Sequence, residues 1–291
     1  MSGRTAAPTA TSPAAYGRTA ALPGPASAAT TAHTAVLTLC LAGPLQSWGA
    51  SSRFARRATE RAPTKSGVLG LLAAAQGRDR AADLSDLAAL KFAVRLDQPG
   101  TRVKDFQTAH HADTGKAMPV SGRFYLADAV FVAAVEGDPA LIHALHSAVR
   151  APVFLPFLGR RSCPPSRPVD LGVHRGRLGR ALRAEPWQAS PWHQSHRKRE
   201  GRVELEVIAD LTAAVDGPGP GTDPADGAAY RPGAVGDALR DQPLSFDPRH
   251  RRYGLREVRT TTVTVANPRS VGPPGRTFVP PPHDPMGLLE E

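Results

Sequence analysis

Lys65 and Ser66 are the residues whose types and position suggest chemistry most directly. They follow Thr64, a good N-cap residue type, and precede the apolar run VLGLLAAA, so they are expected in the first turn of a buried helix. A helix N-terminus offers free backbone N–H groups and partial positive charge, which favour phosphate. Four arginines come just before it: Arg53, Arg56, Arg57 and Arg61. The pattern predicts contact with a phosphodiester backbone; the alternative is that Lys65 is only a solvated cap residue.

The segment is not a nucleotide-triphosphate site. A P-loop needs glycines at the first and last positions of the loop that precedes the lysine. Residues 60–64 read ERAPT, without glycine, and Pro63 also lacks the backbone N–H that would contact phosphate. The sequence therefore excludes nucleotide hydrolysis at this position.

Histidines supply the other candidate chemistry. His110 and His111 stand together in a polar stretch, and His193 and His196 lie in the basic segment PWHQSHRKREGR. Neither pair has cysteine or carboxylate partners at ligand spacing, so no metal and no cofactor is expected. No nucleophile motif of the G-x-S-x-G type is present. A metal-independent ribonuclease could still be assembled from scattered side chains, of which the candidates are His110, His111, Lys116 and Tyr125.

Charge and cysteine content narrow the class of protein. The net charge is +10, and only five of the 36 basic residues are lysine. Such arginine use suits bidentate phosphate contacts, although a biased composition would also produce it. Arg160 and Arg161 form a pair that is either a salt-bridge cluster or a phosphate clamp. Two isolated cysteines and no apolar run long enough for a bilayer favour a reducing, cytoplasmic setting without a membrane partner.

The periodicities predict an α+β fold. Strands are expected at 34–41, 91–97, 123–137 and 152–159, with helices after Thr64 and at 138–150. The strand at 91–97 alternates and should be half-buried, with Arg95 and Asp97 on its polar side. This order matches a ferredoxin-like split βαβ domain, in which two helices cover one face of an antiparallel sheet. RNA-recognition domains of this layout bind RNA on the open face.

Composition divides the chain into four parts. Residues 1–33 have the composition of a disordered extension, and residues 34–160 hold the ferredoxin-like domain. Residues 161–266 should form a smaller C-terminal β unit, in which strands 203–211 and 258–266 pair and 212–237 is a mobile linker. Residues 267–291 read as a proline-rich tail.

Several separate motifs resemble the CRISPR-associated Cas-five family of RAMP proteins, in its CasD-type form. The segments LAGPLQSWG, RAPTKSGVLGLLAAAQGR, FAVRLDQPG, DFQT, RFYLADAVF, LGRRSCPP and DQPLSFDPRHRRYGLREV stand in the family's order between residues 34 and 260. The resemblance implies a RAMP fold with a thumb-like arm at about 98–123. It implies a non-catalytic subunit of the type I-E Cascade surveillance complex, active in antiviral defense.

The resemblance also implies partners and an RNA site. The partners are the five-prime handle of the CRISPR RNA (crRNA), the Cas-seven backbone subunits, the Cascade large subunit and, indirectly, target DNA. The ribonuclease alternative would act on CRISPR repeat RNA. If about six phosphates are contacted, log affinity should fall against log salt with a slope of roughly −4. The expected RNA-binding residues are Gln46, Ser47, Trp48, Gly49, Arg53, Arg56, Arg57, Lys65, Ser66, Lys104, Phe106, Thr108, His110, Arg123, Arg160 and Arg161.

Overall fold

The computed structural model describes residues 34–49, 56–213 and 237–271. The expected N-terminal extension, nearly all of the expected linker, most of the proline-rich tail and Arg53 lie outside these residues. No helix within the described ranges is long and apolar enough to cross a membrane.

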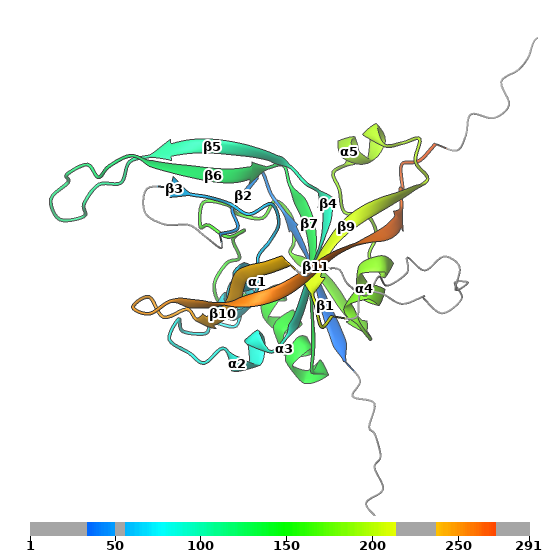
Figure 1. Cartoon of the computed structure of the whole chain (residues 1–291), viewed down its shortest axis with the longest axis horizontal. Coiled ribbons are helices and arrows are strands. Elements are labelled where there is room, and N and C mark those ends of the chain that lie inside the picture. Colours follow the sequence, from blue (N-terminus) through cyan, green and yellow to red (C-terminus); the bar gives the residue numbers. More distant parts are fainter. Residues whose placement is uncertain (1–33, 50–55, 214–236, 272–291) are drawn as a thin grey trace, which may run out of the picture. The chain divides into compact units, whose positions relative to one another are not determined.

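A seven-stranded sheet in the order β10-β11-β9-β4-β7-β1-β8 is the centre of the fold (Figure 1). Every neighbouring pair in it is antiparallel. Its strands are β1 (Ala35–Ala42), β4 (Lys91–Gln98), β7 (Val130–Gly137), β8 (Asp170–Arg175), β9 (Arg202–Asp210), β10 (Asp237–Ser245) and β11 (Arg252–Ala266).

A second sheet carries a hairpin arm. Its strands are β2 (Leu45–Gln46), β3 (Arg56–Arg57), β5 (Thr101–Gln107) and β6 (Ser121–Ala127). Strands β5 and β6 pair along seven residues and reach away from the main sheet (Figure 1). The single strand expected at 123–137 is therefore two strands. They separate at Asp128, whose φ of 55° is incompatible with an extended strand.

Two helices cover one face of the main sheet. The helix α1 (Lys65–Ala75) is buried on most sides, as its apolar sequence predicts. The helix α3 (Pro139–Arg150) begins at Asp138, whose side chain accepts hydrogen bonds from the Ala140 and Leu141 amides. Both helices confirm the sequence prediction. A short helix, α2 (Ser85–Ala88), lies beside them.

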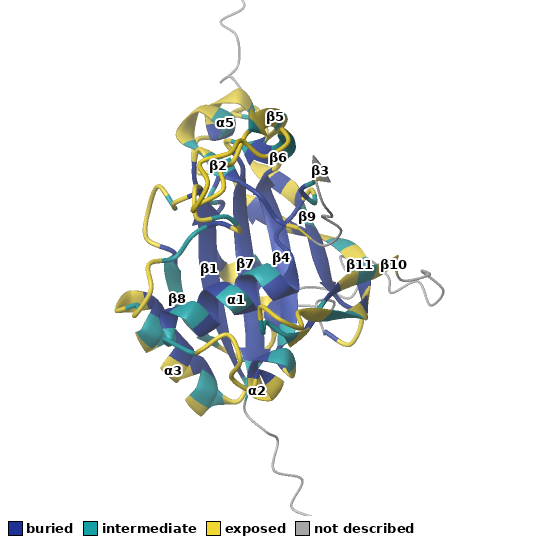
Figure 2. Ribbon diagram, turned by 90° about the vertical axis from the view of Figure 1, so that its left-hand side faces the viewer, coloured by how far each residue is buried: buried dark blue, intermediate teal, exposed yellow. Residues whose placement is uncertain are grey.

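The opposite face of the sheet is also covered, which makes the expectation of an open, RNA-binding face wrong. The helices α4 (Leu178–Ala184) and α5 (Pro191–His196) belong to the segment on this side. Val36 of β1 and Val132 of β7 pack with Leu182 and Trp187 in one buried cluster. Figure 2 shows the central strands β1, β7 and β4 as buried behind α1. Arg95 and Asp97, expected on a polar side, are buried for the same reason.

The C-terminal strands join the main sheet instead of forming a separate unit. Strand β9 pairs with β11, as the sequence predicts, but it also pairs with β4. The fourth strand of the expected ferredoxin-like set is β8, which pairs with β1. The expected strand at 152–159 is wrong. That segment instead packs at the end of α1, where the Val153 amide donates to the Ala75 carbonyl at 2.9 Å.

Candidate nucleic-acid interface

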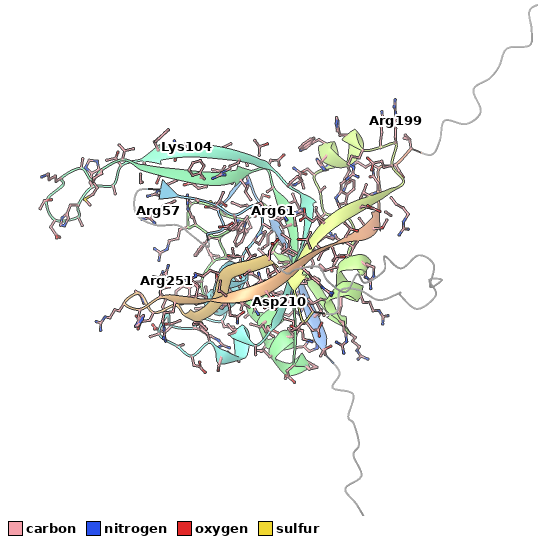
Figure 3. The ribbon with its side chains drawn as sticks, in the orientation of Figure 1. Arg57, Arg61, Lys104, Arg199, Asp210 and Arg251 are labelled. Carbon is pink, nitrogen blue, oxygen red and sulfur yellow. The ribbon has the colours of Figure 1, made fainter. Side chains whose placement is uncertain are left out.

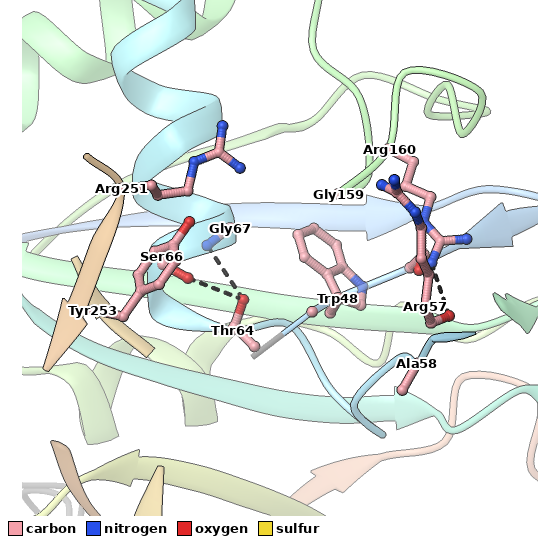
Figure 4. Close-up of a pocket in the computed structure, with 12 residues that line it drawn as sticks. Trp48, Arg57, Ala58, Thr64, Ser66, Gly67, Gly159, Arg160, Arg251 and Tyr253 are labelled. Atoms are coloured by element: carbon pink, nitrogen blue, oxygen red, sulfur yellow. Dashed lines mark hydrogen bonds between the residues drawn. The ribbon is translucent and has the colours of Figure 1, made fainter. Parts of the chain in front are cut away.

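A pocket of about 360 Å³ opens between the first turn of α1, the end of β3, the loop after α3 and the tip of the β10–β11 hairpin (Figure 4). Segments far apart in the sequence meet here. The lining residues are Ser47, Trp48, Gly49, Arg57, Ala58, Thr64, Ser66, Gly67, Gly159, Arg160, Arg251 and Tyr253. Three of them are arginines, so the pocket is suited to an anion.

Trp48 lines this pocket and Gln46 lies behind it, and neither side chain is free to read bases. Both side chains are fully buried. The Gln46 amide nitrogen donates to the Leu41 and Ala129 carbonyls, and its oxygen accepts from the Trp48 indole at 3.0 Å. The expected base contacts of these two residues are therefore wrong, and both residues have a structural role. Ser47 is also buried, and its hydroxyl donates to the Phe124 carbonyl.

Two glycines allow the pocket walls to approach one another. Gly67 lies against the indole of Trp48, and a Cβ built at Gly67 would come within 2.8 Å of the ring. Gly159 has a φ of +83°, and a Cβ there would lie 1.9 Å from the Ser47 carbonyl oxygen. A side chain at either position would therefore displace the loop or helix that forms the pocket.

Lys65 does not point into the pocket, so its expected phosphate contact is wrong. Only 5% of its side chain is exposed, and its ammonium lies 3.3 Å from a carboxylate oxygen of Asp210. The Lys65 amide donates to Asp241, and the Gly67 amide donates to the Thr64 hydroxyl. The protein's own groups thus cap most of the helix N-terminus that was expected to hold phosphate.

A buried set of four charges explains this position of Lys65. Arg256 of β11 bonds Asp210 at 2.5 Å and Asp241 at 2.7 Å. Burial lowers the pKa of Lys65, and the Asp210 carboxylate opposes that change. The side chains join α1 to β9, β10 and β11. They therefore fix the helix against the hairpin whose tip carries Arg251 and Tyr253.

Arg160 is the best-placed cation of the pocket. Its guanidinium stacks over the ring of Tyr125, 4.7 Å from the centroid, and donates to the Arg57 carbonyl at 3.0 Å (Figure 4). Its Nη1 atom is buried and has no hydrogen-bond partner among the described residues. A preorganised guanidinium with a donor to spare can bind a phosphate or a base edge.

Arg251 and Tyr253 complete the pocket, and sequence reasoning missed both. Arg251 lies in the turn between β10 and β11, and Tyr253 lies at the start of β11. The Tyr253 ring packs against Phe246 with centroids 6.5 Å apart. The signal was the segment DPRHRRYG, which carries three arginines beside an aromatic residue. Only the fold reveals that this hairpin tip, about 190 residues from Arg57 and Thr64, meets the same cavity.

The outer face of the arm is a row of cations on aromatic rings. Arg102 stacks over Phe124 at 4.5 Å, and the Lys104 ammonium lies 4.5 Å from the centroid of the Phe106 ring. Phe106 is 63% exposed although it is large and apolar. An exposed aromatic ring beside cations is suited to stacking on unpaired bases. Lys104 and Phe106 thus lie together, on a surface separate from the pocket.

The ribonuclease candidates are not brought together as a set. His110, His111 and Lys116 lie at the tip of the arm, where the His111 amide donates to the Lys116 carbonyl. Tyr125 is buried at the arm's base, opposite Val103. His110 is seven positions after Val103, which is roughly 20 Å along an extended chain. Within the described residues, no cluster of metal-ligating side chains occurs.

The remaining expected residues are scattered over the arm and its surroundings. Gly49, Thr108 and Arg161 are exposed, and the Nε atom of Arg123 is buried without a partner among the described residues. Arg56 lies in β3, but the structure describes only its backbone. Of the expected residues, the pocket gathers Ser47, Trp48, Gly49, Arg57, Ser66 and Arg160.

Solved structures of CRISPR-associated proteins share this fold. One, described as the crystal structure of a Cas protein, is 34% identical, covers 82% of this chain and all of its own, and has a TM-score of 0.55. Another, from a CRISPR RNA-guided surveillance complex, is 31% identical with a TM-score of 0.61, covering 82% of this chain and 94% of its own. The fold is thus that of a CRISPR-associated protein.

The sequence comparisons identify the family. The family model described as CRISPR-associated protein (Cas_Cas5) matches residues 36–259. The CRISPR system Cascade subunit CasD of Escherichia coli (strain K12) is 38% identical over 158 residues, which are 47% of this chain and 70% of that protein. The chain belongs to the Cas-five family of CRISPR-associated proteins.

Proposed function

We propose that this protein is a Cascade subunit that binds the five-prime handle of the crRNA and caps the row of Cas-seven backbone subunits beside the large subunit. Its relative CasD is named as a Cascade subunit, and a structural neighbour belongs to an RNA-guided surveillance complex. In this role the protein serves CRISPR defense in the cytoplasm as a non-catalytic component. Its contact with target DNA is indirect, through the RNA that it holds.

The observation that carries the proposal is the convergence of Arg57, Arg160 and Arg251 on one pocket. They come from β3, the loop after α3 and the β10–β11 hairpin. The structure holds Arg160 in place with its Nη1 donor unused. Single-stranded RNA of fixed sequence is read by splaying its bases and holding its phosphates, which needs such a site.

The strand arrangement supports the RAMP assignment. Within the main sheet, the order β4-β7-β1-β8 places the first and third strands at the centre and the second and fourth outside. This is the strand order of a ferredoxin-like domain with helices α1 and α3 as its crossovers. We assign residues 34–175 to that domain and the C-terminal strands to its extension.

The arm supplies a second part of the RNA site in this proposal. Its outer face carries Lys104 over Phe106 and Arg102 over Phe124. A base that leaves the pocket can stack on Phe106 while its phosphate meets Lys104. The exposed side chains of Thr108 and His110 extend that face toward the arm's tip.

Binding of labelled handle RNA by single-charge variants tests the proposal. Arg160→Ala removes a cation held toward the pocket, and the affinity should fall on the order of tenfold because a charge-assisted hydrogen bond is lost. Arg61→Ala is the matched control, since it removes the same charge from a guanidinium that is already paired with Glu206. The control should change the affinity less than about twofold. Equal effects of the two variants would refute a phosphate site in the pocket.

A further inference from the structure

One surface outside the pocket combines an exposed tryptophan with unpaired cations. Trp192 is 58% exposed, whereas Trp48 and Trp187 are buried. It lies on α5, in the segment that covers the sheet face opposite α1. In Figure 3, Arg199 of this segment lies well away from Arg57 and Arg251, which line the pocket. The surface is therefore separate from the proposed handle site.

The Trp192 side chain is held in position. Its indole nitrogen donates to a carboxylate oxygen of Asp128 at 3.2 Å, which ties α5 to the turn between β6 and β7. His193 meets Trp192 edge-to-face at 5.3 Å and Trp187 at 5.7 Å, with interplanar angles of 90° and 72°. An aromatic ring that is both exposed and fixed loses little conformational entropy when a flat ligand stacks on it.

A buried asparagine brings two basic segments together beside the tryptophan. The Asn267 side chain donates to the Gln194 carbonyl at 3.2 Å and to the Arg197 carbonyl at 2.9 Å. The backbone amide of Val271 also donates to the Lys198 carbonyl at 2.9 Å. Residues 194–201 and 267–271 therefore form one ordered surface, although about 70 residues separate them in the sequence.

The charge of this surface is strongly positive. The single acidic residue in these two segments, Glu200, is paired with Arg197 at 2.5 Å. Three further cations of these segments, and Arg202 directly after the first segment, are exposed and have no carboxylate partner among the described residues. The three are Lys198, Arg199 and Arg269. Four uncompensated cations beside an aromatic platform match the chemistry of a polynucleotide, whose phosphates and bases occur together.

We propose that this α5 surface is a second binding site for single-stranded nucleic acid, in which a base stacks on Trp192 and the phosphates meet the four cations. A protein partner would instead be expected to bury a cluster of apolar side chains around the tryptophan. The neighbours of Trp192 on α5 are Pro191, Ser195 and His196, which are exposed and mostly polar. The site takes a single strand because stacking on Trp192 needs an unpaired base.

Tryptophan fluorescence reports this binding directly. The full-length protein is titrated with oligothymidylate and, in a parallel arm, with oligouridylate of equal length, so that DNA and RNA are compared without handle sequence. Stacking should quench the emission of exposed Trp192. The Trp192→Phe variant should lose the quenching and retain binding, measured by anisotropy of a labelled oligonucleotide. The Trp192→Leu variant should bind about tenfold more weakly, because it lacks an aromatic plane.

The Phe and Leu variants form a matched pair, because both lose the hydrogen bond to Asp128 and only Phe keeps a ring. A charge variant gives a second readout. Lys198→Ala with Arg199→Ala should flatten the salt dependence of log affinity by roughly 1.4. Arg61→Ala with Arg78→Ala is its control, since those guanidiniums are already paired with Glu206 and Asp86. An unquenched wild type, or equal affinity for the Phe and Leu variants, would overturn the proposal.

The proposals for the pocket and for the α5 surface can be refuted independently. A variant with Arg57→Ala and Arg160→Ala should lose affinity for handle RNA but keep the quenching of Trp192 by either homopolymer. If that variant loses the quenching as well, the strand binds through the pocket alone and the second site is refuted.

Discussion

Replacing Lys65 with methionine separates a structural lysine from an RNA-binding one. Methionine keeps the length and volume of the stem and removes the charge. Lys65 is absent from the pocket lining, and its ammonium faces Asp210 at 3.3 Å. We therefore expect Lys65→Met to leave the affinity for handle RNA, and its salt dependence, unchanged. A lysine that bound a phosphate would instead reduce the log–log salt slope by about 0.7.

The stability of the same variant can be worked out from the buried charges. After Lys65→Met, Asp210 still accepts from Arg256 and from the Phe92 amide, but the buried set then holds one cation, Arg256, and two carboxylates, Asp210 and Asp241. The free energy of unfolding should fall by about 3 kcal/mol, the lower end of the cost of removing one partner of a buried ion pair. Asp210→Ala should cost about 3–5 kcal/mol, since it leaves Lys65 and Arg256 short of a counter-charge.

Urea denaturation and RNA titrations at several salt concentrations test both statements. The pKa of Lys65 is lowered by burial, so the protonated form is disfavoured in the folded state. Relative to Lys65→Met, the wild type should therefore gain stability as the pH rises toward 10.5, the ordinary lysine pKa. A Lys65→Met protein that folds normally but binds handle RNA with a weaker salt dependence would refute this reasoning.

Three further predictions concern a buried ion pair, a close backbone approach and the protonation of a histidine. Arg95→Leu should lower the free energy of unfolding by about 3–5 kcal/mol in urea denaturation, because it leaves the fully buried Asp97 without its cation; Arg95→Lys should recover part of the loss. Gly159→Ala should weaken handle RNA binding in anisotropy titrations without abolishing folding, since its Cβ would strike the Ser47 carbonyl; binding equal to wild type would contradict the close approach. Burial, with the Arg197 and His196 charges, lowers the pKa of His193, so the free energy of unfolding should fall as the pH drops below 6.5. The melting temperatures of wild type and His193→Gln should therefore converge at low pH. A constant difference between the two melting temperatures would contradict the pKa shift.

The helices were predictable because local signals define them. The Thr64 and Asp138 caps and the apolar spacing of α3 place both boundaries within a residue or two. The division of the strand at Asp128 was not predictable, because a single residue with positive φ leaves the alternation of side chains on both sides intact.

The burial and pairing of the charged side chains were the least predictable features. Lys65 and Arg95 have sequence contexts typical of solvated or ligand-binding residues, and both are buried. Lys65 pairs with Asp210 from a distant segment, whereas Arg95 pairs with Asp97 of its own strand and donates to the Glu185 and Pro186 carbonyls about 90 residues later. Burial on both faces of β4 depends on α4 and Trp187, about 90 residues later. Charge pairing of this kind requires the tertiary fold.

Some of the residues that line the pocket were predictable from the sequence, and others depend on the tertiary fold. Arg57 and Ser66 lie near one another in sequence, and Arg160 was marked by its arginine pair. Arg251 and Tyr253 enter the pocket only because β11 pairs with β9 and β10. A local motif can mark a basic hairpin, but the register of those strands decides which cavity its tip meets.

Photocrosslinking of handle RNA to the protein tests the central claim most directly. Single 4-thiouridines are placed along the RNA, and the crosslinked peptides are identified by mass spectrometry. We expect one position to crosslink to the peptides that carry Arg160 and to those that carry Tyr253, because both line the same pocket. Crosslinks confined to the arm tip or to α5, with none at these two peptides, would contradict a handle site in the pocket.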